Sequence, residues 1–463
     1  MRRLLFAALA TLGLCALAAN AQALPVIPGG AGYGMETAAG RGGTVYKVTN
    51  LNASGAGSLK ACIDGATPRV CVFEVSGTIP ITSDLIIRND FITIAGQTAP
   101  SPGIMLRGAA LKITASNVLV QHIRIRVGDD VTGPAPENRD ALKIEGSSTK
   151  TVRNIVIDHC SLSWAIDETL SVWGPHDNIT LTNNFFTEPL NESLHPDYDG
   201  VGVIPHGYGV LVGSTPGNSV TIVGNLFAHI VERNPLSRAT ELVFVNNLVY
   251  DRGTMDLDLQ SDGVLMTKST VLKNHFIKGP SFSRDTSPIF IHTGTGSLTL
   301  GANSRAYQTG NLSENYTRSL VTLTGGDTIA GLLDLTAYPV WNSGLTMVQT
   351  TNNGVYDRVL NSAGARPGDR DSVDKRIVNE VKSRGGRIIN CVASNNTTRC
   401  AKNAGGWPYV AQNRRTLTLP ANPNTVTASG YTNLELWLHS MEQSVSGVVQ
   451  SSSPAAPRLL TVN

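Results

Sequence analysis

The segment "ITLTNNFF", residues 179–186, decides the fold because related segments recur along the chain. Three others align with it without gaps: "IVIDHCSL" from Ile155, "VTIVGNLF" from Val220 and "LVFVNNLV" from Leu242. Earlier members are "FITIAGQT" from Phe91 and "VLVQHIRIR" from Val118. The four aligned starts lie 24, 41 and 22 residues apart, which we interpret as one, two and one turns of a repeat of about 22 residues.

A repeat of this length, with two or three short strands and polar residues at fixed bends, is typical of a parallel β-helix. Asparagines mark the bend of the repeat: Asn183, Asn184, Asn225, Asn246 and Asn247. Asparagine tolerates a left-handed backbone there, and its amide can bond the amide of the next coil. We therefore expect an all-β protein with a single-stranded right-handed parallel β-helix. A leucine-rich horseshoe would need regular leucines where these coils use Val and Ile, and no propeller blade signature recurs.

The repeat becomes indistinct beyond about residue 300, and almost no helical periodicity is present between residues 70 and 369. We expect the β-helix domain over residues 24–300, with the remaining coils and a tail packed along it over residues 301–463. The tail is predicted to contain short helices. One runs from Arg370 to Lys382, with acidic residues at its start and basic residues and glycines at its end. Another is predicted at "NLELWLHSM".

The composition excludes several classes of protein. With 41% hydrophobic and 16% charged residues, the 463-residue chain can bury a large core and is neither disordered nor a membrane protein. A balance of 37 basic against 35 acidic residues gives no field that favours nucleic acid. Residues 1–23 combine two arginines, an apolar run and an Ala-Gln-Ala ending, which predicts a secretory signal peptide cleaved after Ala23. We expect a secreted monomer, extracellular or periplasmic.

The cysteines agree with an oxidising compartment. Cys62 and Cys71 are nine residues apart, as are Cys391 and Cys400, and both pairs are plausible disulfides. Cys160 lies alone in an apolar strand, where we expect a buried small hydrophobic residue rather than a nucleophile.

Candidate functional residues are acids that precede strands. Parallel coils bury their interior, so function must lie on the outer face. Asp140 precedes the strand in "PENRDALKIEG", and Asp167 and Glu168 precede the strand in "SWAIDETLSVW". Groups at the same point of the repeat stack on one face, and converging carboxylates with oxygen-only ligands favour Ca²⁺. The alternative is that the acids only cap turns.

Two arginines flank a proline in "RNPLSR", about three coils later. Pro235 makes the backbone between Arg233 and Arg238 rigid, and guanidiniums held in this way can bind a planar carboxylate bidentately. The sequence therefore predicts an anionic ligand. The alternative is a solvent-exposed ion pair of Arg233 with Glu232 or Glu241.

Five segments together resemble the pectate lyases of polysaccharide lyase family one. They are "TIAGQTAPSPGIMLRG", "VLVQHIRIRVGD", "RDALKI", "VIDHCSLSWAIDETLSV" and "RNPLSR", and the resemblance covers about Val45 to Gly253. The segments "GARPGDRDSVDKRIVNEV" and "GYTNLELWLHSME" resemble the C-terminal region of one bacterial branch.

The resemblance implies a catalytic β-helix domain that cleaves 1,4-linked galacturonan by β-elimination with Ca²⁺, giving unsaturated products. By matching motifs, Asp140 and Asp167 are calcium ligands. Arg233 is the proton-abstracting arginine, and Arg238 holds the substrate carboxylate. Asp158 and His159 match a structural Ile-Asp-His segment.

The chain departs from the family pattern at two places. Ser171 replaces a third calcium acid, so Glu168 or Asn138 is expected to complete the ligand set. "HGYG" replaces a substrate-binding lysine, so His206 or Tyr208 is expected to bind the carboxylate or to act as base or acid.

Two other functions stay open. A glycoside hydrolase on this fold would need a pair of carboxylates around the bond, for which Asp256 and Asp258 are candidates. The departures at Ser171 and Tyr208 also leave open a β-helix that binds polysaccharide without cleaving it.

Overall fold

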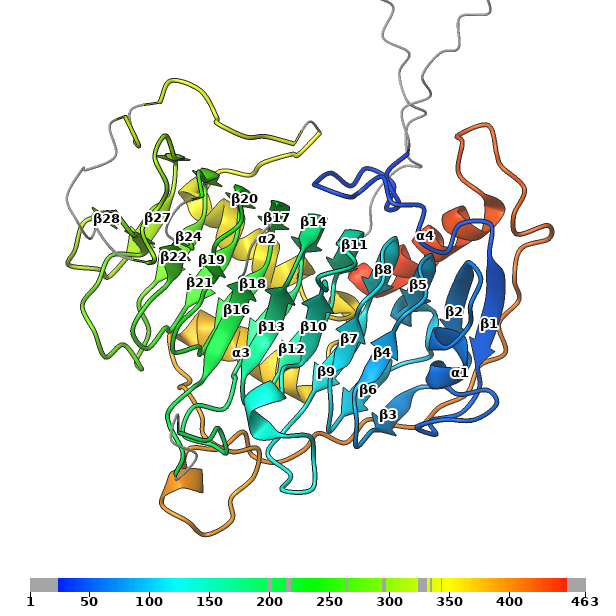
Figure 1. Cartoon of the computed structure of the whole chain (residues 1–463). Helices are drawn as coiled ribbons and strands as arrows, with labels where there is room; N and C mark the ends of the chain where they lie inside the picture. Colours follow the sequence, from blue (N-terminus) through cyan, green and yellow to red (C-terminus); the bar gives the residue numbers. More distant parts are fainter. Residues whose placement is uncertain are drawn as a thin grey trace, which may run out of the picture.

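The computed structural model describes residues 24–197, 202–213, 218–262, 265–293, 297–323, 331–333, 335–342 and 344–447. In these ranges the chain passes through three parallel sheets in turn, one of ten strands and two of nine, and forms a parallel β-helix (Figure 1). The expected fold class is confirmed. The predicted signal peptide lies outside the described residues, and the division of the chain at residue 300 stays a prediction.

From β2 onward, each coil contributes one strand to each sheet, and β1 adds a tenth strand to sheet 1. Sheet 1 contains β1 Thr44–Val48, β2 Arg69–Phe73, β5 Ile92–Ala95, β8 Val118–Gln121, β11 Val152–Asp158, β14 His176–Thr182, β17 Ser219–Val223, β20 Glu241–Val245, β23 Lys268–Leu272 and β26 Arg305–Thr309. Sheet 2 contains β4 Leu85–Ile87, β7 Leu111–Ile113, β10 Leu142–Glu145, β13 Glu168–Trp173, β16 Tyr208–Val212, β19 Leu236–Ser237, β22 Leu257–Leu259, β25 Ile289–Ile291 and β28 Val321–Leu323. Sheet 3 contains β3 Gly77–Pro80, β6 Ile104–Arg107, β9 Ile123–Arg126, β12 Ser161–Ser163, β15 Phe185–Thr187, β18 Leu226–Ala228, β21 Leu248–Tyr250, β24 His275–Ile277 and β27 Leu312–Glu314.

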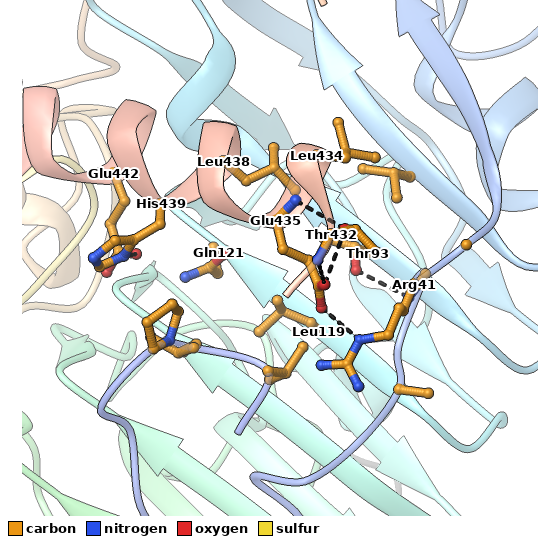
Figure 2. Close-up of a pocket in the computed structure, with 17 residues that line it drawn as sticks. Arg41, Thr93, Leu119, Gln121, Thr432, Leu434, Glu435, Leu438, His439 and Glu442 are labelled. Carbon is orange, nitrogen blue, oxygen red and sulfur yellow. Dashed lines mark hydrogen bonds and ion pairs between the residues drawn. The ribbon is translucent and has the colours of Figure 1, made fainter. Parts of the chain in front are cut away.

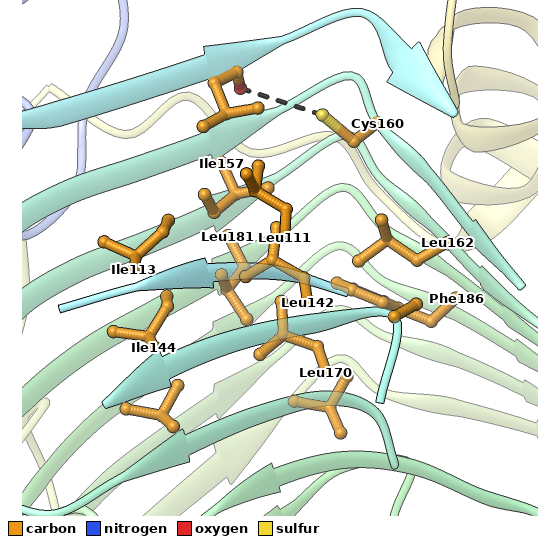
Figure 3. Packing of buried hydrophobic residues seen from close by; sticks show 14 of the residues in the cluster. Leu111, Ile113, Leu142, Ile144, Ile157, Cys160, Leu162, Leu170, Leu181 and Phe186 are labelled. Atoms are coloured by element: carbon orange, nitrogen blue, oxygen red, sulfur yellow. Dashed lines mark hydrogen bonds between the residues drawn. The ribbon is translucent and has the colours of Figure 1, made fainter. Parts of the chain in front are cut away.

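The repeated segments pair as the alignment predicts, but one interval was interpreted wrongly. Ile155 pairs with Ile179, Ile179 with Val220, and Val220 with Leu242. The 41-residue interval is therefore one coil rather than two, because a long insertion after β15 leaves and rejoins the same coil. Apolar side chains of all three sheets fill the interior, and Figure 3 shows Ile157 of sheet 1 and Leu142 of sheet 2 among them.

Asparagines stabilise the bend between sheets 1 and 3 in two ways. Asn184, Asn225 and Asn247 form a buried ladder in which each Nδ2 donates to the next Oδ1 at 3.0–3.1 Å, and Asn274 and Asn311 continue it. Asn183 and Asn246 instead take the left-handed backbone, with φ of 52° and 54°. Both predicted roles of asparagine are confirmed, and Cys160 occupies the ladder position of its coil, where its N–H donates to Asn184.

In the ranges that the structure describes, four α-helices accompany the coils: α1 Leu59–Ile63, α2 Gly354–Ser362, α3 Ser372–Ser383 and α4 Asn433–Ser446. Short 3-10 helices are η1 Gly96–Thr98, η2 Pro136–Asn138, η3 Thr351–Asn353, η4 Pro367–Asp369 and η5 Arg399–Ala401. The two helices predicted in the tail are confirmed. α3 begins after Arg370 because the Asp371 side chain caps it. The expectation of almost no helix before residue 369 was wrong for α2. Within the described residues, none of the helices combines the length and apolar character needed to cross a bilayer.

The tail covers two of the three outer faces. α2 and α3 pack on sheet 3 through an apolar cluster that includes Phe185, Leu248 and Ile377. α4 packs on sheet 1, and Figure 2 shows Thr432 capping it and Arg41 binding Glu435 at this junction. Among the described residues, none from the tail lines the cleft over sheet 2. The tail therefore leaves open the face that carries the predicted acids.

Candidate active site

A cleft of about 560 Å³ lies over sheet 2. Its lining combines acids, bases and rings: Lys112, Glu137, Asn138, Asp140, Lys143, Glu145, Asp167, Glu168, Ser171, Trp173, His195, His206, Leu211 and Arg233. The predicted acids, Arg233 and His206 share this cleft because β10, β13 and β16 are neighbours and β19 follows.

Three carboxylates converge in the cleft. One oxygen each of Asp140, Asp167 and Glu168 lies within 4.8 Å of the others. Asp140 is only 3% exposed, and burial together with the charge of Asp167 raises its pKa to about 7. Ser171 donates a hydrogen bond to it. An all-oxygen set with repelling charges has the donor chemistry that a hard divalent cation requires.

Arg233 reaches this cluster from the turn before β19. It has a left-handed φ of 63°, and its Nη1 donates to Glu168 Oε1. Burial lowers its pKa to about 10. The alternative ion pairs were wrong: Glu232 accepts a hydrogen bond from Thr254, and Glu241 accepts one from Tyr33. The Arg233 guanidinium thus binds the cluster of three carboxylates through Glu168.

A column of three rings lies beside the acids, and two of them, His195 and His206, line the cleft. The His195 and His206 rings stack with centroids 3.8 Å apart, and Tyr208 follows His206 at 3.9 Å. His206 Nε2 lies 2.9 Å from Asp167 Oδ1, and the Arg233 guanidinium lies 4.3 Å from the centre of the Tyr208 ring. The residues that replace the expected lysine therefore contact both the acids and the arginine.

Arg238 lies outside the set that lines the cleft. Its Nε and Nη2 donate to Gln260 Oε1 at 3.2 and 3.1 Å, and its Nη1 donates to Asp262 Oδ1 at 3.1 Å. It follows β19, whereas Arg233 precedes it. Burial is the main cause of the lowered pKa of Arg233, and the positive charge of Arg238 lowers it further. The two arginines are thus at opposite ends of one short strand.

Four other residues singled out from the sequence are not among those that line the cleft: Asp158, His159, Asp256 and Asp258. Asp158 accepts a hydrogen bond from Gln121 and lies 2.7 Å from His159 Nδ1, at the bend between sheets 1 and 3. Asp256 is buried against Arg252, and Asp258 against Gln260 and His292. Neither Asp256 nor Asp258 lines the cleft, so they do not form the open pair that hydrolysis would require.

The cysteines are placed as expected. Cys62–Cys71 and Cys391–Cys400 are disulfides. Cys160 is buried, and burial raises the pKa of its thiol to about 12, which makes it a poor nucleophile.

Sequence reasoning missed several residues of the cleft: Lys112, Lys143, Trp173 and His195. Lys143 pairs with Ser171 across the strands, and Lys112 pairs with Lys143. These positions follow from the register once Asp140 and Asp167 are placed. His195 lies in the long insertion, whose only signal in the sequence was a polar, histidine-containing composition.

Known proteins are similar to the chain over most of its length. Probable pectate lyase C from Aspergillus terreus is 30% identical over 462 residues, covering 95% of this chain and 98% of that relative. Probable pectate lyase C from Aspergillus fumigatus is 31% identical over 455 residues, covering 92% and 97%. The crystal structure of Jun a 1, the major allergen from cedar pollen, covers 73% of this chain and 92% of its own, with a TM-score of 0.51 and 18% identity.

The last similarity shows the fold alone, and no family model matches the chain. The relatives named above that align over nearly the whole chain are fungal. They do not support the bacterial branch that was expected from the C-terminal segments.

Proposed function

The chain belongs to the pectate lyases, which are polysaccharide lyases, and we propose that it cleaves 1,4-linked galacturonan by calcium-assisted β-elimination. The observation that carries the proposal is the convergence of three carboxylates with Arg233 in one open cleft. The two disulfides support the further proposal that the protein is secreted.

Asp140, Asp167 and Glu168 are the residues that would hold Ca²⁺, with Asn138 at the rim of the same cleft. When bound, the ion supplies positive charge that stabilises the negative charge developing on the uronate. Ser171 keeps Asp140 oriented by its hydrogen bond. The carboxylates therefore act by binding and orientation.

Arg233 is proposed as the group that takes the C5 proton. A free guanidinium is a poor base because its pKa exceeds about 12. Burial already lowers the pKa of Arg233 to about 10, which makes its neutral form more accessible. When the C5–H bond breaks, its electron pair forms the C4–C5 double bond, and the 4-linked oxygen leaves with the other part of the chain.

Arg238, His206 and Tyr208 are proposed to bind substrate. Arg238 is held by Gln260 and Asp262 in an orientation suited to a carboxylate. His206 and Tyr208 stack beside Arg233 and can direct the uronate toward it. These contacts replace the single lysine of the family pattern.

The test is a panel of uronan polymers, each with Ca²⁺ and with chelator, followed by the ultraviolet absorbance of the unsaturated product. We expect absorbance to rise with polygalacturonate and Ca²⁺ and to stop with chelator. New reducing ends without this absorbance would indicate hydrolysis and contradict the proposal. Binding of polygalacturonate without any cleavage would indicate a non-catalytic protein.

A further inference from the structure

Trp173 is a residue of the cleft that the proposed reaction does not use. It ends β13, on the outer face of sheet 2, and is 46% exposed. It lines the cleft together with Glu145, its strand partner on the preceding coil. A large aromatic side chain left open at the edge of a polar cleft is suited to contact a ligand that has an apolar face.

A glycine makes room for this ring on the next coil. Val172 pairs with Val212, so Gly213 is the neighbour of Trp173 across the strands. A Cβ at Gly213 would lie 2.6 Å from Cζ3 and 2.8 Å from Cε3 of Trp173. The six-membered ring therefore occupies the space that any side chain at position 213 would need.

Arg238 is the neighbour on the coil after that. Val212 pairs with Ser237, and the Arg238 N–H donates to Val212 O at 2.8 Å. With coils about 4.8 Å apart, the Cα atoms of Trp173 and Arg238 are about 10 Å apart. The indole over Gly213 and the guanidinium side chain of Arg238 thus come from positions in one row across neighbouring coils.

We propose that Trp173, Gly213 and Arg238 form a binding subsite for one galacturonosyl residue of the polymer, beside the residue that reacts. The sugar packs the apolar C–H groups of its ring against the indole, and its carboxylate binds the Arg238 guanidinium. This inference rests on the proposed function and states how the cleft holds a longer chain.

The test compares Trp173→Ala, Trp173→Phe and Gly213→Ala on trigalacturonate and hexagalacturonate. For Trp173→Ala we expect KM for hexagalacturonate to rise roughly tenfold, with kcat within about twofold, because a stacking contact supports binding. Gly213→Ala displaces the ring and should act in the same direction. Trp173→Phe keeps an aromatic face and should stay within about threefold of wild type.

Tyr409→Ala is the matched control, because Tyr409 is an aromatic residue that is 89% exposed and lies outside the cleft lining. A wild-type KM in Trp173→Ala on both substrates would overturn the subsite and leave the lyase proposal intact. If the wild-type protein forms no unsaturated product, tryptophan fluorescence is measured instead while hexagalacturonate is added to wild type and to Trp173→Phe. A fluorescence change in wild type that is missing in Trp173→Phe supports the subsite. The same fluorescence change in both proteins overturns it.

Discussion

The outer faces of sheets 2 and 3 carry the same kinds of charge but use them differently. On sheet 3, the fully buried Arg126 donates to Asp371 and Asp374 at the start of α3, at 2.5 and 2.8 Å. On sheet 2, Asp140 and Glu168 converge with Arg233 in an open cleft. The covered face matches its charges within the protein, whereas the open face has an excess of carboxylates.

This difference affects the pKa values. On the covered face, burial opposes ionisation, but Arg126 and Arg124 hold the pKa of Asp371 below its usual range. On the open face, burial and the charge of Asp167 raise the pKa of Asp140. Helix α3 of the tail thus covers sheet 3 and pairs its charges, whereas the cleft over sheet 2 stays open for the cation and substrate that we propose.

Arg233→Lys should give the largest effect, a loss of activity. We expect kcat/KM on polygalacturonate to fall about 10²–10⁴-fold, because the group proposed to take the proton is lost. The rate of formation of the unsaturated product measures it. Arg126→Lys on the covered face is the control, with catalytic constants near those of wild type at temperatures where it stays folded. Equal losses of kcat/KM in Arg233→Lys and Arg126→Lys would contradict the distinction between a catalytic open face and a structural covered face.

Arg126→Ala should have the next largest effect, on stability. Removing Arg126 leaves two buried carboxylates with only the Arg124 guanidinium, 3.5 Å away, as countercharge, and we expect a loss of about 3 kcal/mol in the free energy of unfolding. Denaturant titration measures it. Arg318→Ala removes an exposed ion pair with Asp285 and should cost less than about 1 kcal/mol. Similar costs for the two variants would show that the covered pairs are not structural.

His229 makes the covered face sensitive to pH. It is buried, and although burial opposes its protonation, its hydrogen bond with Asp251 and the Glu380 carboxylate of α3, 3.3 Å from its Nε2, raise its pKa to about 9. Because the folded pKa lies above the unfolded value near 6.5, this stabilisation is complete below pH ~6.5 and is lost as pH rises through ~9.

The measurement is the free energy of unfolding across this window for wild type and His229→Gln. We expect the advantage of wild type to shrink by on the order of 3 kcal/mol between pH ~6.5 and ~10. A difference that does not depend on pH would show that His229 is neutral in the folded protein.

Ser171→Asp should give the smallest effect, on the open face. A fourth carboxylate beside Asp140 should lower the Kd for Ca²⁺ about tenfold, as more negative ligands strengthen calcium sites. Calorimetric titration of the metal measures it. Ser171→Ala removes the same hydrogen bond without adding charge and should change the Kd less than about threefold. Tighter binding in the Ala variant would show that the hydrogen bond, not charge, limits affinity.

The sequence predicted most of the β-helix because the strand segments repeat with recognisable bends. The sequence interpretation was wrong for the 41-residue interval between Ile179 and Val220. The insertion after β15 is nearly as long as a coil, so one coil was counted as two. The interpretation also missed α2, which is short and gains its stability from packing against sheet 3.

For the candidate site, position along the repeat placed Asp140, Asp167 and Arg233 over one sheet. Contacts between neighbouring coils could not be predicted in this way. The binding of Arg238 to Asp262 and the packing of Trp173 over Gly213 depend on the register of adjacent strands, which an approximate repeat does not fix. His195 was missed because its insertion has no repeat to align.

The most direct test of the account is a crystal structure of the Arg233→Lys variant with Ca²⁺ and trigalacturonate. We predict an ion bound by Asp140, Asp167 and Glu168 that also contacts a uronate carboxylate, with a C5 hydrogen facing the Lys side chain at position 233. An ion bound elsewhere, or a sugar chain lying on another face of the coil, would contradict the claim that the open face of sheet 2 is the catalytic face.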